Sequence, residues 1–397
     1  MAQAVIVDAV RTPIGRAAKG SLKSVRADEL AAIPLRALIE RNPQLDPSTI
    51  GDVMMGCGYG EGEQGYNVGR IASLLAGIDH HVPACTVNRF CASSLQTTRM
   101  ALHAIEAGEG DTYIAAGVEA VSRAGRGGQF EFNPRVDGSE GSLYNVYIPM
   151  GMTAENVADR CKVSRESQDE WALVSQTRAV AAQESGHFDA EIVPVTVPAH
   201  TETDKEGNEV ELPETVVSKD DGPRPGTTME KLAALQPVFK PDGSVTAGNS
   251  CPLNDGAAAL LVMSEERARQ LGMTPKVRIL ASTVAAIRPE IMGLGPIPAI
   301  QALLERTKMT MDDIDVVEIN EAFAAQIVPC KAELHIDEEK LNPFGGAIAL
   351  GHPFGMTGAR IMTTLINDMQ TLDATYGIES MCVAGGMGMA MLVERLS

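Results

Sequence analysis

The sequence predicts an α/β protein built from two alternating halves, and three observations support this fold class. The chain has 397 residues, enough for two or three domains, and its 44% hydrophobic and 21% charged residues are ordinary for a globular protein. Short apolar runs alternate with helical patterns in the first ~120 residues and again after Gly256. Glycine, proline and charged residues dominate the stretch between them, from Gly125 to Ser250. Strands that alternate with helices predict sheets covered by helices.

The first half is expected to open with a strand at Val5–Val10, followed by strands at Asp52–Met55 and Tyr113–Ala116. A helical pattern over Ala27–Glu40 predicts an amphipathic helix, which Pro34 should kink or shorten because proline has no N–H to donate. Together these elements predict the first α/β unit.

The second half repeats this alternation of strand and helix. The expected helix is Pro298–Arg306, and the expected strands are Ala257–Met263, Val277–Ala281, Asp315–Ile319, Met381–Ala384 and Met389–Val393. A short apolar strand that ends in glycine occurs in both halves, at Tyr113–Gly117 and Cys382–Gly386. This likeness favours two related units.

The middle of the chain is expected to be a loop-rich insertion that contains one good helix. Ser164 or Ser167 can cap that helix, Glu170 follows Ser167 at capping-box spacing, and Gly186 ends it. The segment Thr201–Gly226 has no apolar periodicity. It therefore predicts an insertion on the surface.

Composition and charge exclude several classes of protein. The chain has 33 Lys and Arg residues against 52 Asp and Glu residues, so its net charge of −19 repels nucleic acid and anionic membranes. The N-terminus lacks the basic segment, apolar stretch and cleavage site of a secretion signal, and no apolar run reaches the ~20 residues of a membrane span. We therefore expect neither a nucleic-acid partner nor a membrane span.

The seven cysteines indicate a reducing compartment. They are odd in number and scattered, with no Cys-x-x-Cys pair, which disfavours a disulfide framework and a zinc or iron–sulfur site. No Walker loop, His-Glu-x-x-His or calcium loop occurs either, so no metal site is expected. The cytoplasm is the simplest location, where most free thiols are small buried hydrophobes.

One glycine motif has two interpretations. The run Gly60-Glu-Gly-Glu-Gln-Gly65 matches the dinucleotide-binding fingerprint and lies between an apolar run and a helical pattern. However, Glu61 and Glu63 would face the pyrophosphate, and the spacer after the apolar run is long for a tight turn. We interpret the motif as a glycine-rich loop, with a nicotinamide cofactor as the lesser alternative.

Cys91 stands where a helix should begin. Helical spacing starts at Ala92 and stops at Gly108. A helix N-terminus stabilises a thiolate, and its free N–H groups can receive an oxyanion. The position therefore predicts a nucleophile, and the alternative is a buried cysteine that only packs.

His352 follows four apolar residues, Ala347–Leu350, which predict a strand that ends just before it. Glycine and proline on either side lift the imidazole out of the chain, where it can act as a base. Gly351, Gly355 and Gly358 indicate backbone that passes close to a neighbour. This favours the functional interpretation over a turn with a surface histidine.

Two further segments allow either chemistry or simple structure. Asn320 ends the apolar run Val316–Ile319, where its amide can orient a water or, more simply, cap a helix. Cys382 ends a buried strand before Gly385 and Gly386, where the thiol can move a proton or only pack in the core. For Cys382 the residues alone favour neither interpretation.

Four segments, in this order along the chain, resemble the thiolase family. They are Asn88-Arg-Phe-Cys91-Ala-Ser-Ser-Leu-Gln, Asn320-Glu-Ala-Phe-Ala, Gly351-His352-Pro-Phe-Gly-Met-Thr-Gly-Ala-Arg and Cys382-Val-Ala-Gly-Gly-Met-Gly. Further matches, which extend the likeness over the whole chain, are Asp8–Gly15, Gly117–Ser122, Met150–Asn156 and Thr246–Ala257.

The resemblance implies a specific version of the α/β fold. Two similar βαβαβαββ halves form a five-layer αβαβα arrangement, with an inserted loop domain over the active site. Residues 1–120 would be the N-terminal half, residues 121–250 the loop domain with its return segment, and residues 251–397 the C-terminal half.

The resemblance also implies a role for each site residue. Cys91 is the nucleophile, His352 takes its proton, and Cys382 gives or takes a proton at the α-carbon. Asn320 fixes a water that forms one oxyanion hole with His352. The backbone N–H groups of Cys91 and Ala384 form the other. Ala384 stands where the family usually has glycine, which leaves the N–H in place.

Coenzyme A is implied as a substrate, with no permanently bound cofactor. The matching substrate-binding positions are Met150, Arg224, Ala247, Cys251 and Phe323. Two residues depart from the family pattern. Cys251 replaces a common serine that contacts the pantetheine, and Pro149 replaces a histidine of many biosynthetic members. Both positions affect ligand contacts rather than the bond-making residues.

The implied activity is that of an acyl-CoA C-acyltransferase, which cleaves 3-ketoacyl-CoA with coenzyme A in fatty-acid β-oxidation. The alternative is an acetyl-CoA acetyltransferase that condenses two acetyl-CoA to acetoacetyl-CoA, and a remote alternative is an inactive thiolase-like lipid carrier. The resemblance also implies a homodimer or homotetramer and allows a β-oxidation partner subunit.

Overall fold

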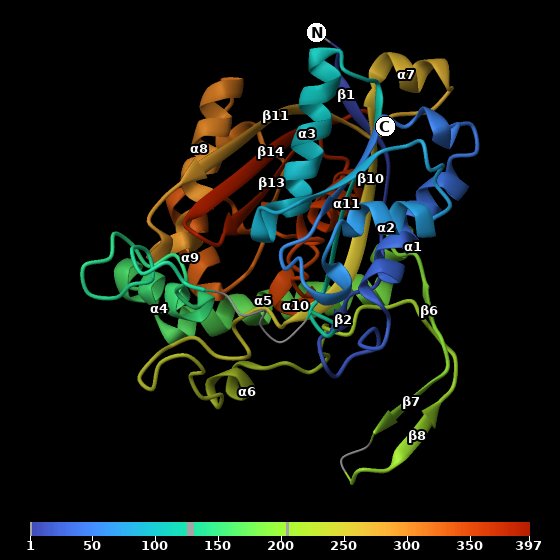
Figure 1. The fold of residues 1–397 in the computed structure, drawn as a ribbon. Coiled ribbons are helices and arrows are strands. Elements are labelled where there is room, and N and C mark those ends of the chain that lie inside the picture. Colours follow the sequence, from blue (N-terminus) through green and yellow to red (C-terminus); the bar gives the residue numbers. More distant parts are fainter. Residues whose placement is uncertain (1, 125–130, 204–205) are drawn as a thin grey trace.

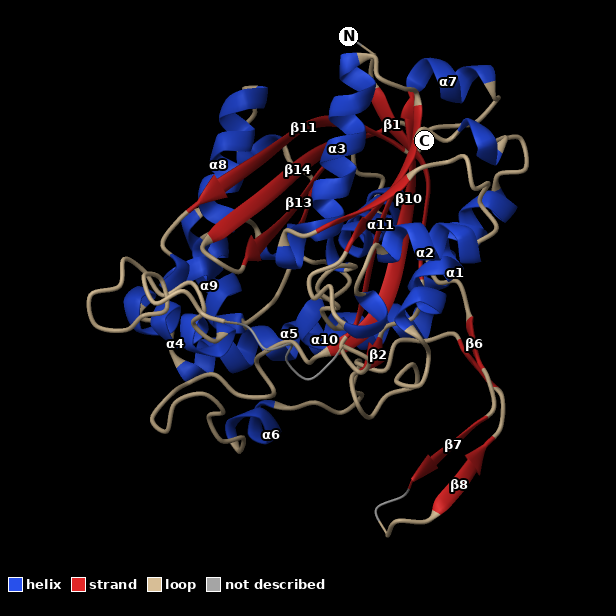
Figure 2. Cartoon of the chain, in the orientation of Figure 1, coloured by secondary structure: helices blue, strands red, loops and turns tan. Residues whose placement is uncertain are grey.

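The computed structural model, which describes residues 2–124, 131–203 and 206–397, has a large central sheet with helices on both faces (Figures 1 and 2). Nine strands follow the hydrogen-bonded order β12-β13-β14-β11-β1-β10-β5-β3-β4, and a tenth, β2, lies beside β10. Their bounds are β1 (Ala4–Arg11), β2 (Gly15–Arg16), β3 (Asp52–Gly56), β4 (Ala84–Val87), β5 (Thr112–Ala120), β10 (Asn254–Ser264), β11 (Val277–Ala286), β12 (Val316–Ile319), β13 (Tyr376–Val383) and β14 (Met387–Arg395).

The two halves of the sheet have the same pairing pattern. In the first half β3 pairs in parallel with β5, and β10 is antiparallel to both β5 and β1. In the second half β12 pairs in parallel with β13, and β14 is antiparallel to both β13 and β11. A short antiparallel ladder between β1 and β11, at Val5 and Ile6, joins the halves edge to edge. The boundary expected at residue 250 precedes β10, which lies in the sheet of the first half.

The helices complete five layers around the sheet. Helices α1 (Ala27–Arg41) and α2 (Val68–Leu75) cover the outer face of the first half, and α8 (Pro296–Thr307) covers that of the second, beside α9 (Ala324–Glu333). Between the halves, α3 (Ser93–Ala107) and α11 (Thr357–Thr371) pack against each other. Three buried apolar clusters fill the spaces between these layers. The thiolase-like arrangement expected from the sequence is confirmed.

Most expected strands are confirmed, but two local predictions need correction. The helix α1 runs to Arg41 with Pro34 inside it, so the proline does not shorten the helix, while the kink that was the other expected outcome stays a prediction. The run Ala347–Leu350 forms a single helical turn, α10, and not the expected strand. Four apolar residues fit a buried helix as well as a buried strand, and here Gly346 and Gly351 bound the turn on either side.

The middle of the chain forms helices over one end of the sheet and a projecting arm (Figure 1). Its elements are α4 (Met150–Cys161), α5 (Arg165–Ser185), β6 (Val195–Val197), β7 (His200–Thr203), β8 (Glu209–Leu212), β9 (Thr215–Val217) and α6 (Met229–Ala233), and α7 (Glu265–Gln270) follows β10. Ser164 caps α5 by accepting the N–H of Ser167, and Gly186 ends it, as the sequence predicts.

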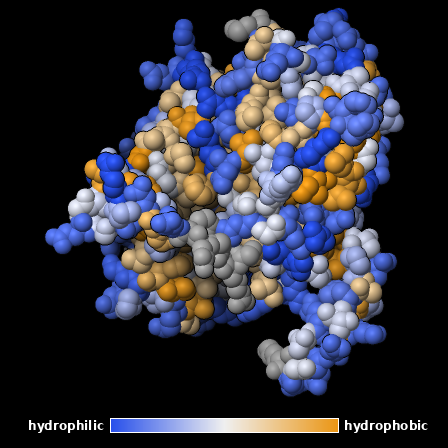
Figure 3. Space-filling model, viewed as in Figure 1, coloured by the Kyte–Doolittle hydropathy of each residue, from blue (hydrophilic) through white to orange (hydrophobic). Residues whose placement is uncertain are grey.

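The expected surface insertion corresponds to the arm, in which β7 pairs with β8 and β6 with β9. Residues 204 and 205 of that insertion lie outside the described residues. Figure 3 shows mainly hydrophilic side chains on the arm. None of the described helices is long and apolar enough to cross a membrane.

Candidate active site

Cys91 lies in a single turn of 3₁₀ helix, Phe90–Ala92, directly before α3, as the sequence predicts. Phe90 adopts a left-handed backbone with φ of 45°. Asn88 fixes this turn, because its side chain accepts the N–H of Phe90 at 2.8 Å and donates to the carbonyl of Gly58 at 2.8 Å. The strained turn thus presents the Cys91 thiol at the buried end of the sheet, where it is 8% exposed.

Burial controls the charge of the Cys91 thiol. It raises the pKa of Cys91 to about 12, although the backbone N–H groups of Ala384 and of Cys91 itself bond to the sulfur and act to lower the pKa. The thiol is therefore protonated at neutral pH, and the helix N-terminus alone does not ionise it. The same two N–H groups are those that the family resemblance assigns to an oxyanion hole.

His352 is held from several sides. Its backbone N–H donates to Asn254 Oδ1 at 3.0 Å, and the ring nitrogen Nδ1 lies 2.6 Å from Thr357 Oγ1. The preceding residue, Gly351, has φ of 112°, and a Cβ there would lie 2.6 Å from the Asn254 side chain, so glycine is required. Burial, with a smaller contribution from Arg360, lowers the pKa of His352 to about 3. The imidazole is therefore neutral in the resting protein, and burial makes it a weaker base than an exposed histidine.

Asn320 and Cys382 approach this site from neighbouring strands. Asn320 follows β12 and donates its N–H to the carbonyl of Ser380 in β13 at 2.9 Å. Its Nδ2 lies 3.4 Å from Nε2 of His352, while its buried Oδ1 has no protein partner among the described residues. Cys382, near the end of β13, is fully buried, and burial together with the nearby Cys91 raises its pKa. The structure thus places Asn320 against His352 and Cys382 near Cys91, and the bond from Asn320 to Ser380 joins the strand ends that carry Asn320 and Cys382.

A buried carboxylate that the sequence analysis did not single out connects the two halves of the site. Glu119 in β5 accepts the N–H of Gly58 at 2.8 Å and of Tyr59 at 3.1 Å, on the side of the Cys91 turn. It also accepts the N–H of Gly355 at 2.9 Å, in the loop of His352. Glu119 belongs to the family-like segment Gly117–Ser122, and the further sequence signal is a charged residue inside an apolar strand.

The N-termini of the two central helices are in direct contact. Ala359 in α11 donates its N–H to Ser94 Oγ in α3 at 2.8 Å. A Cβ on Gly358 would lie 2.2 Å from the backbone nitrogen of Leu95, so the helices can approach this closely only with glycine there. This contact, together with Glu119, fixes the Cys91 turn relative to the His352 loop.

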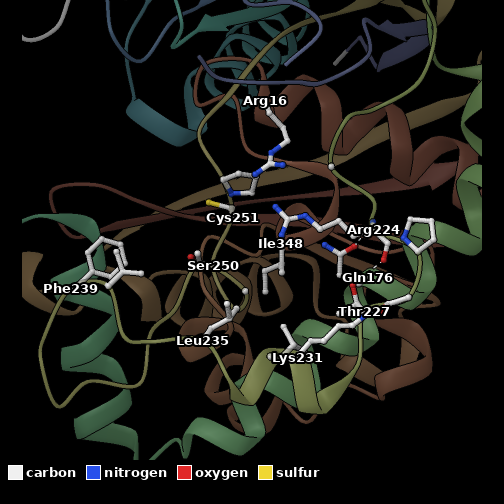
Figure 4. A pocket seen from close by; sticks show the side chains of 18 residues that line it. Arg16, Gln176, Arg224, Thr227, Lys231, Leu235, Phe239, Ser250, Cys251 and Ile348 are labelled. Atoms are coloured by element: carbon white, nitrogen blue, oxygen red, sulfur yellow. Dashed lines mark hydrogen bonds between the residues drawn. The ribbon is translucent and has the colours of Figure 1, made fainter. Parts of the chain in front are cut away.

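A pocket of about 460 Å³ opens beside Cys251 (Figure 4). Its walls include two predicted substrate residues besides Cys251, namely Arg224 and Ala247, and the cations Arg16 and Lys231. Burial, together with the nearby Arg16, lowers the pKa of Arg224, which points to mutual repulsion between the two guanidinium groups. The pocket is therefore suited to an anionic ligand, despite the negative charge of the whole chain.

The other two predicted substrate residues, Met150 and Phe323, lie outside the lining of this pocket. They pack in a small apolar cluster that includes Cys382. The Cys251 N–H donates to the carbonyl of Ala322 at 3.1 Å, so the pocket wall is joined to this cluster. The predicted substrate residues thus lie in two adjoining places, the wall of the cationic pocket and the apolar cluster that contains Cys382.

Comparison with known proteins gives a consistent result. Family models described as "Thiolase, N-terminal domain" and "Thiolase, C-terminal domain" match residues 4–266 and 273–395. A beta-ketoadipyl-CoA thiolase of Acinetobacter baylyi is 46% identical over 417 residues, covering 100% of both chains. A 3-ketoacyl-CoA thiolase of Shewanella denitrificans is 47% identical over 400 residues, also covering 100% of both. The crystal structure of a Bacillus anthracis acetyl-CoA acetyltransferase has a TM-score of 0.89 and 40% identity, covering 100% of this chain and 99% of that chain.

Proposed function

This chain belongs to the thiolase family and is an acyltransferase, and we propose that it cleaves 3-ketoacyl-CoA with coenzyme A into acetyl-CoA and a shortened acyl-CoA. The observation that supports this proposal is two buried pairs, Cys91 with Cys382 and Asn320 with His352, in a protein whose cationic pocket is lined by Cys251. A protonated thiol and a neutral imidazole at one site can combine attack and proton transfer in one step.

In the first half-reaction, the Cys91 sulfur attacks the 3-keto carbon while its proton passes to Nε2 of His352. The bond between C2 and C3 then breaks, and its electron pair leaves with acetyl-CoA as an enolate that takes a proton from Cys382. This leaves an acyl group on Cys91, a protonated His352 and an ionised Cys382. Covalent catalysis splits one difficult step into two.

In the second half-reaction, free coenzyme A attacks the acylated Cys91. Its thiol proton goes to Cys382, and the departing Cys91 sulfur recovers its proton from His352, so every proton returns to its starting group. Two oxyanions form during the cycle on different oxygens. The N–H groups of Cys91 and Ala384 stabilise one, and His352 with a water on Asn320 stabilises the other, each worth roughly 3 kcal/mol.

The cationic pocket supports coenzyme A as the substrate that supplies phosphates. Arg16, Arg224 and Lys231 place three positive side chains in one pocket of an acidic protein. Cys251 stands between that pocket and the reacting thiols, where the pantetheine would pass. No permanently bound cofactor is needed for the steps above, because the two thiols and the imidazole move every proton.

We favour the degradative direction, as in fatty-acid β-oxidation, over synthesis of acetoacetyl-CoA. The Arg89-Phe-Cys-Ala-Ser-Ser94 segment is closer to degradative thiolases, and 46% identical relatives carry the name 3-ketoacyl-CoA thiolase. Synthesis of acetoacetyl-CoA stays the second candidate because the structural neighbour is an acetyl-CoA acetyltransferase.

The two directions differ in the substrates that each tolerates. Thiolysis of acetoacetyl-CoA should be assayed beside thiolysis of a long-chain 3-ketoacyl-CoA. Comparable kcat/KM for both substrates, or a preference for the longer one, supports degradation. Activity on acetoacetyl-CoA alone would reject the degradative direction.

Alkylation tests the nucleophile separately. Turnover should be lost in step with alkylation of Cys91 by iodoacetamide, whatever happens at the exposed Cys161, and preincubation with acetyl-CoA should protect Cys91. Protection is the informative control, because it requires that the substrate occupy the same thiol. Labelling of Cys91 without loss of turnover rejects the assignment and leaves the inactive lipid carrier as the better account.

We also propose a homodimer in the cytoplasm, formed through the edge of the first half's sheet. The strand β4 ends the sheet, and its residues are only partly buried. Apolar side chains are exposed beside this edge. The exposed fraction is 101% for Tyr66, which precedes α2, and 46% and 39% for Leu74 and Leu75, which end α2. An open strand edge beside exposed apolar side chains favours pairing with a second copy. Sedimentation of Leu74→Lys/Leu75→Lys should show monomers where the wild type shows dimers.

A further inference from the structure

The hydrogen bonds around the His352 ring identify which of its nitrogens carries the proton. Nδ1 lies 2.6 Å from Thr357 Oγ1, and that oxygen lies 2.8 Å from the carbonyl oxygen of Pro353. A hydroxyl has one proton to donate, and a carbonyl can only accept. The Thr357 hydroxyl therefore donates to Pro353 and accepts from the N–H at Nδ1.

The opposite assignment conflicts with the same contacts. If the Thr357 hydroxyl donated to Nδ1, it could no longer donate to the Pro353 carbonyl, and the ring proton would sit on Nε2. That proton would face Nδ2 of Asn320, which is itself a donor and lies 3.4 Å away. The two ring nitrogens, the Thr357 hydroxyl and the Pro353 carbonyl all have a partner only when Nδ1 carries the proton. Buried polar groups are rarely left without a partner.

We propose that Thr357 is a positioning residue that holds His352 with its proton on Nδ1 and so leaves Nε2 unprotonated and able to take the Cys91 proton. Thr357 lies in the first turn of α11 and is fully buried. The ring is neutral at working pH because burial lowers its pKa to about 3, so it carries one N–H, whose place matters. The consequence for catalysis rests on the proposed function, whereas the tautomer is a property of the resting enzyme.

Loss of the hydroxyl should change both the tautomer and the chemistry. In Thr357→Val the shape is kept, but Nδ1–H has no acceptor, so the form with the proton on Nε2 gains population. That form cannot receive the Cys91 proton, because the Sγ–H bond breaks only as a new Nε2–H bond forms. Acylation of Cys91 should slow while substrate binding stays intact.

The tautomer can be read directly by NMR of the enzyme labelled with ¹⁵N-histidine. The chain has seven histidines, and the His352 signal is assigned by its loss in His352→Gln. We expect a protonated Nδ1 and an unprotonated Nε2 in the wild type and in Thr357→Ser, and a shift toward the opposite tautomer in Thr357→Val. A protonated Nε2 in the resting wild type overturns the proposal.

The rate of coenzyme A release when acetyl-CoA acylates Cys91 tests the consequence. Thr357→Val should acylate about 10- to 100-fold more slowly with KM unchanged, and Thr357→Ser should recover most of that loss. Wild-type acylation in Thr357→Val also overturns the proposal. If no acyl-enzyme forms in the wild type, the proposed function fails, yet the NMR measurement still decides the tautomer.

Discussion

The two halves of the molecule have the same strand pattern but supply different chemistry from equivalent places. In each half a buried segment leads into the N-terminus of a central helix, α3 in the first half and α11 in the second. The first half places the thiol of Cys91 there and the second the imidazole of His352. Burial keeps both uncharged, since it raises the pKa of the thiol and lowers that of the imidazole. The repeated scaffold therefore sets the shared position and burial, and the side chain sets the role.

The largest effect is expected when the thiol that the first half supplies is removed. Cys91→Ala leaves no atom to carry the acyl group, so kcat for thiolysis should fall by on the order of 10⁴-fold or more. The measurement is thiolysis of acetoacetyl-CoA by the purified variant. Cys161→Ala, which removes an exposed thiol outside the site, is the matched control and should keep wild-type activity.

The second effect separates the roles of the two thiols. Cys382→Ala keeps the nucleophile but removes the group that protonates the enolate, so carbon–carbon cleavage should slow roughly 10²- to 10⁴-fold. Acylation of Cys91 by acetyl-CoA should be affected much less, because the leaving group in that step is the coenzyme A thiolate, which is far less basic than an enolate and depends less on a proton from Cys382. Equal losses in both assays would contradict a special role of Cys382 in protonating the enolate.

A third prediction concerns the close contact between the two halves, where α11 packs against α3. In Gly358→Ala the new Cβ would lie 2.2 Å from the Leu95 nitrogen, so α11 must move away from α3. We expect a loss of about 3 kcal/mol in the free energy of unfolding, measured by urea denaturation. The control is Gly60→Ala, whose Cβ would meet its nearest atom at 3.9 Å. A Gly358→Ala protein as stable as this control contradicts the close contact.

The pH dependence of stability tests the neutral imidazole. The unfolded chain binds a proton on His352 below its ordinary pKa of 6.5, whereas the folded chain does not until about 3, so stability must fall as pH falls through this window. Between pH 7 and pH 5 the wild type should lose roughly 2 kcal/mol more than His352→Gln. Parallel curves for the two proteins would show that the ring is not held neutral.

The smallest expected effect concerns the cationic pocket, which lies away from the central helices α3 and α11. Arg224→Ala removes one of three cations, so the KM for coenzyme A should rise by about tenfold at low salt and less at high salt, while kcat stays the same. An unchanged KM at every salt concentration would place the phosphates elsewhere.

Local patterns predicted the alternating fold and drew attention to Cys91 and His352, whereas Asn320 and Cys382 were predicted as site residues only by the family resemblance. Cys91 precedes a clear helical pattern, and the glycines around His352 correspond to a left-handed residue at Gly351 and a close helix contact at Gly358. Local signals could not show that the run Ala347–Leu350 is a helical turn, since four apolar residues fit either state.

The sequence also could not predict hydrogen bonds between residues that lie far apart in the chain. Glu119 accepts from Gly58, 61 positions away, and from Gly355 in the loop of His352, 236 positions away, and no local pattern predicts such pairs. Thr357 belongs to the family-like segment that contains His352, but its position beside the imidazole and its bond to the Pro353 carbonyl depend on the folded loop between them.

One measurement tests the central claim most directly. The wild-type enzyme is mixed with acetyl-CoA, quenched in acid and digested, and the peptide that carries Cys91 is weighed by mass spectrometry. We predict an acetyl adduct on Cys91 that disappears when free coenzyme A is added before the quench. An adduct on Cys251 or Cys382 instead, or no adduct on any cysteine, would contradict a mechanism that passes through an acylated Cys91.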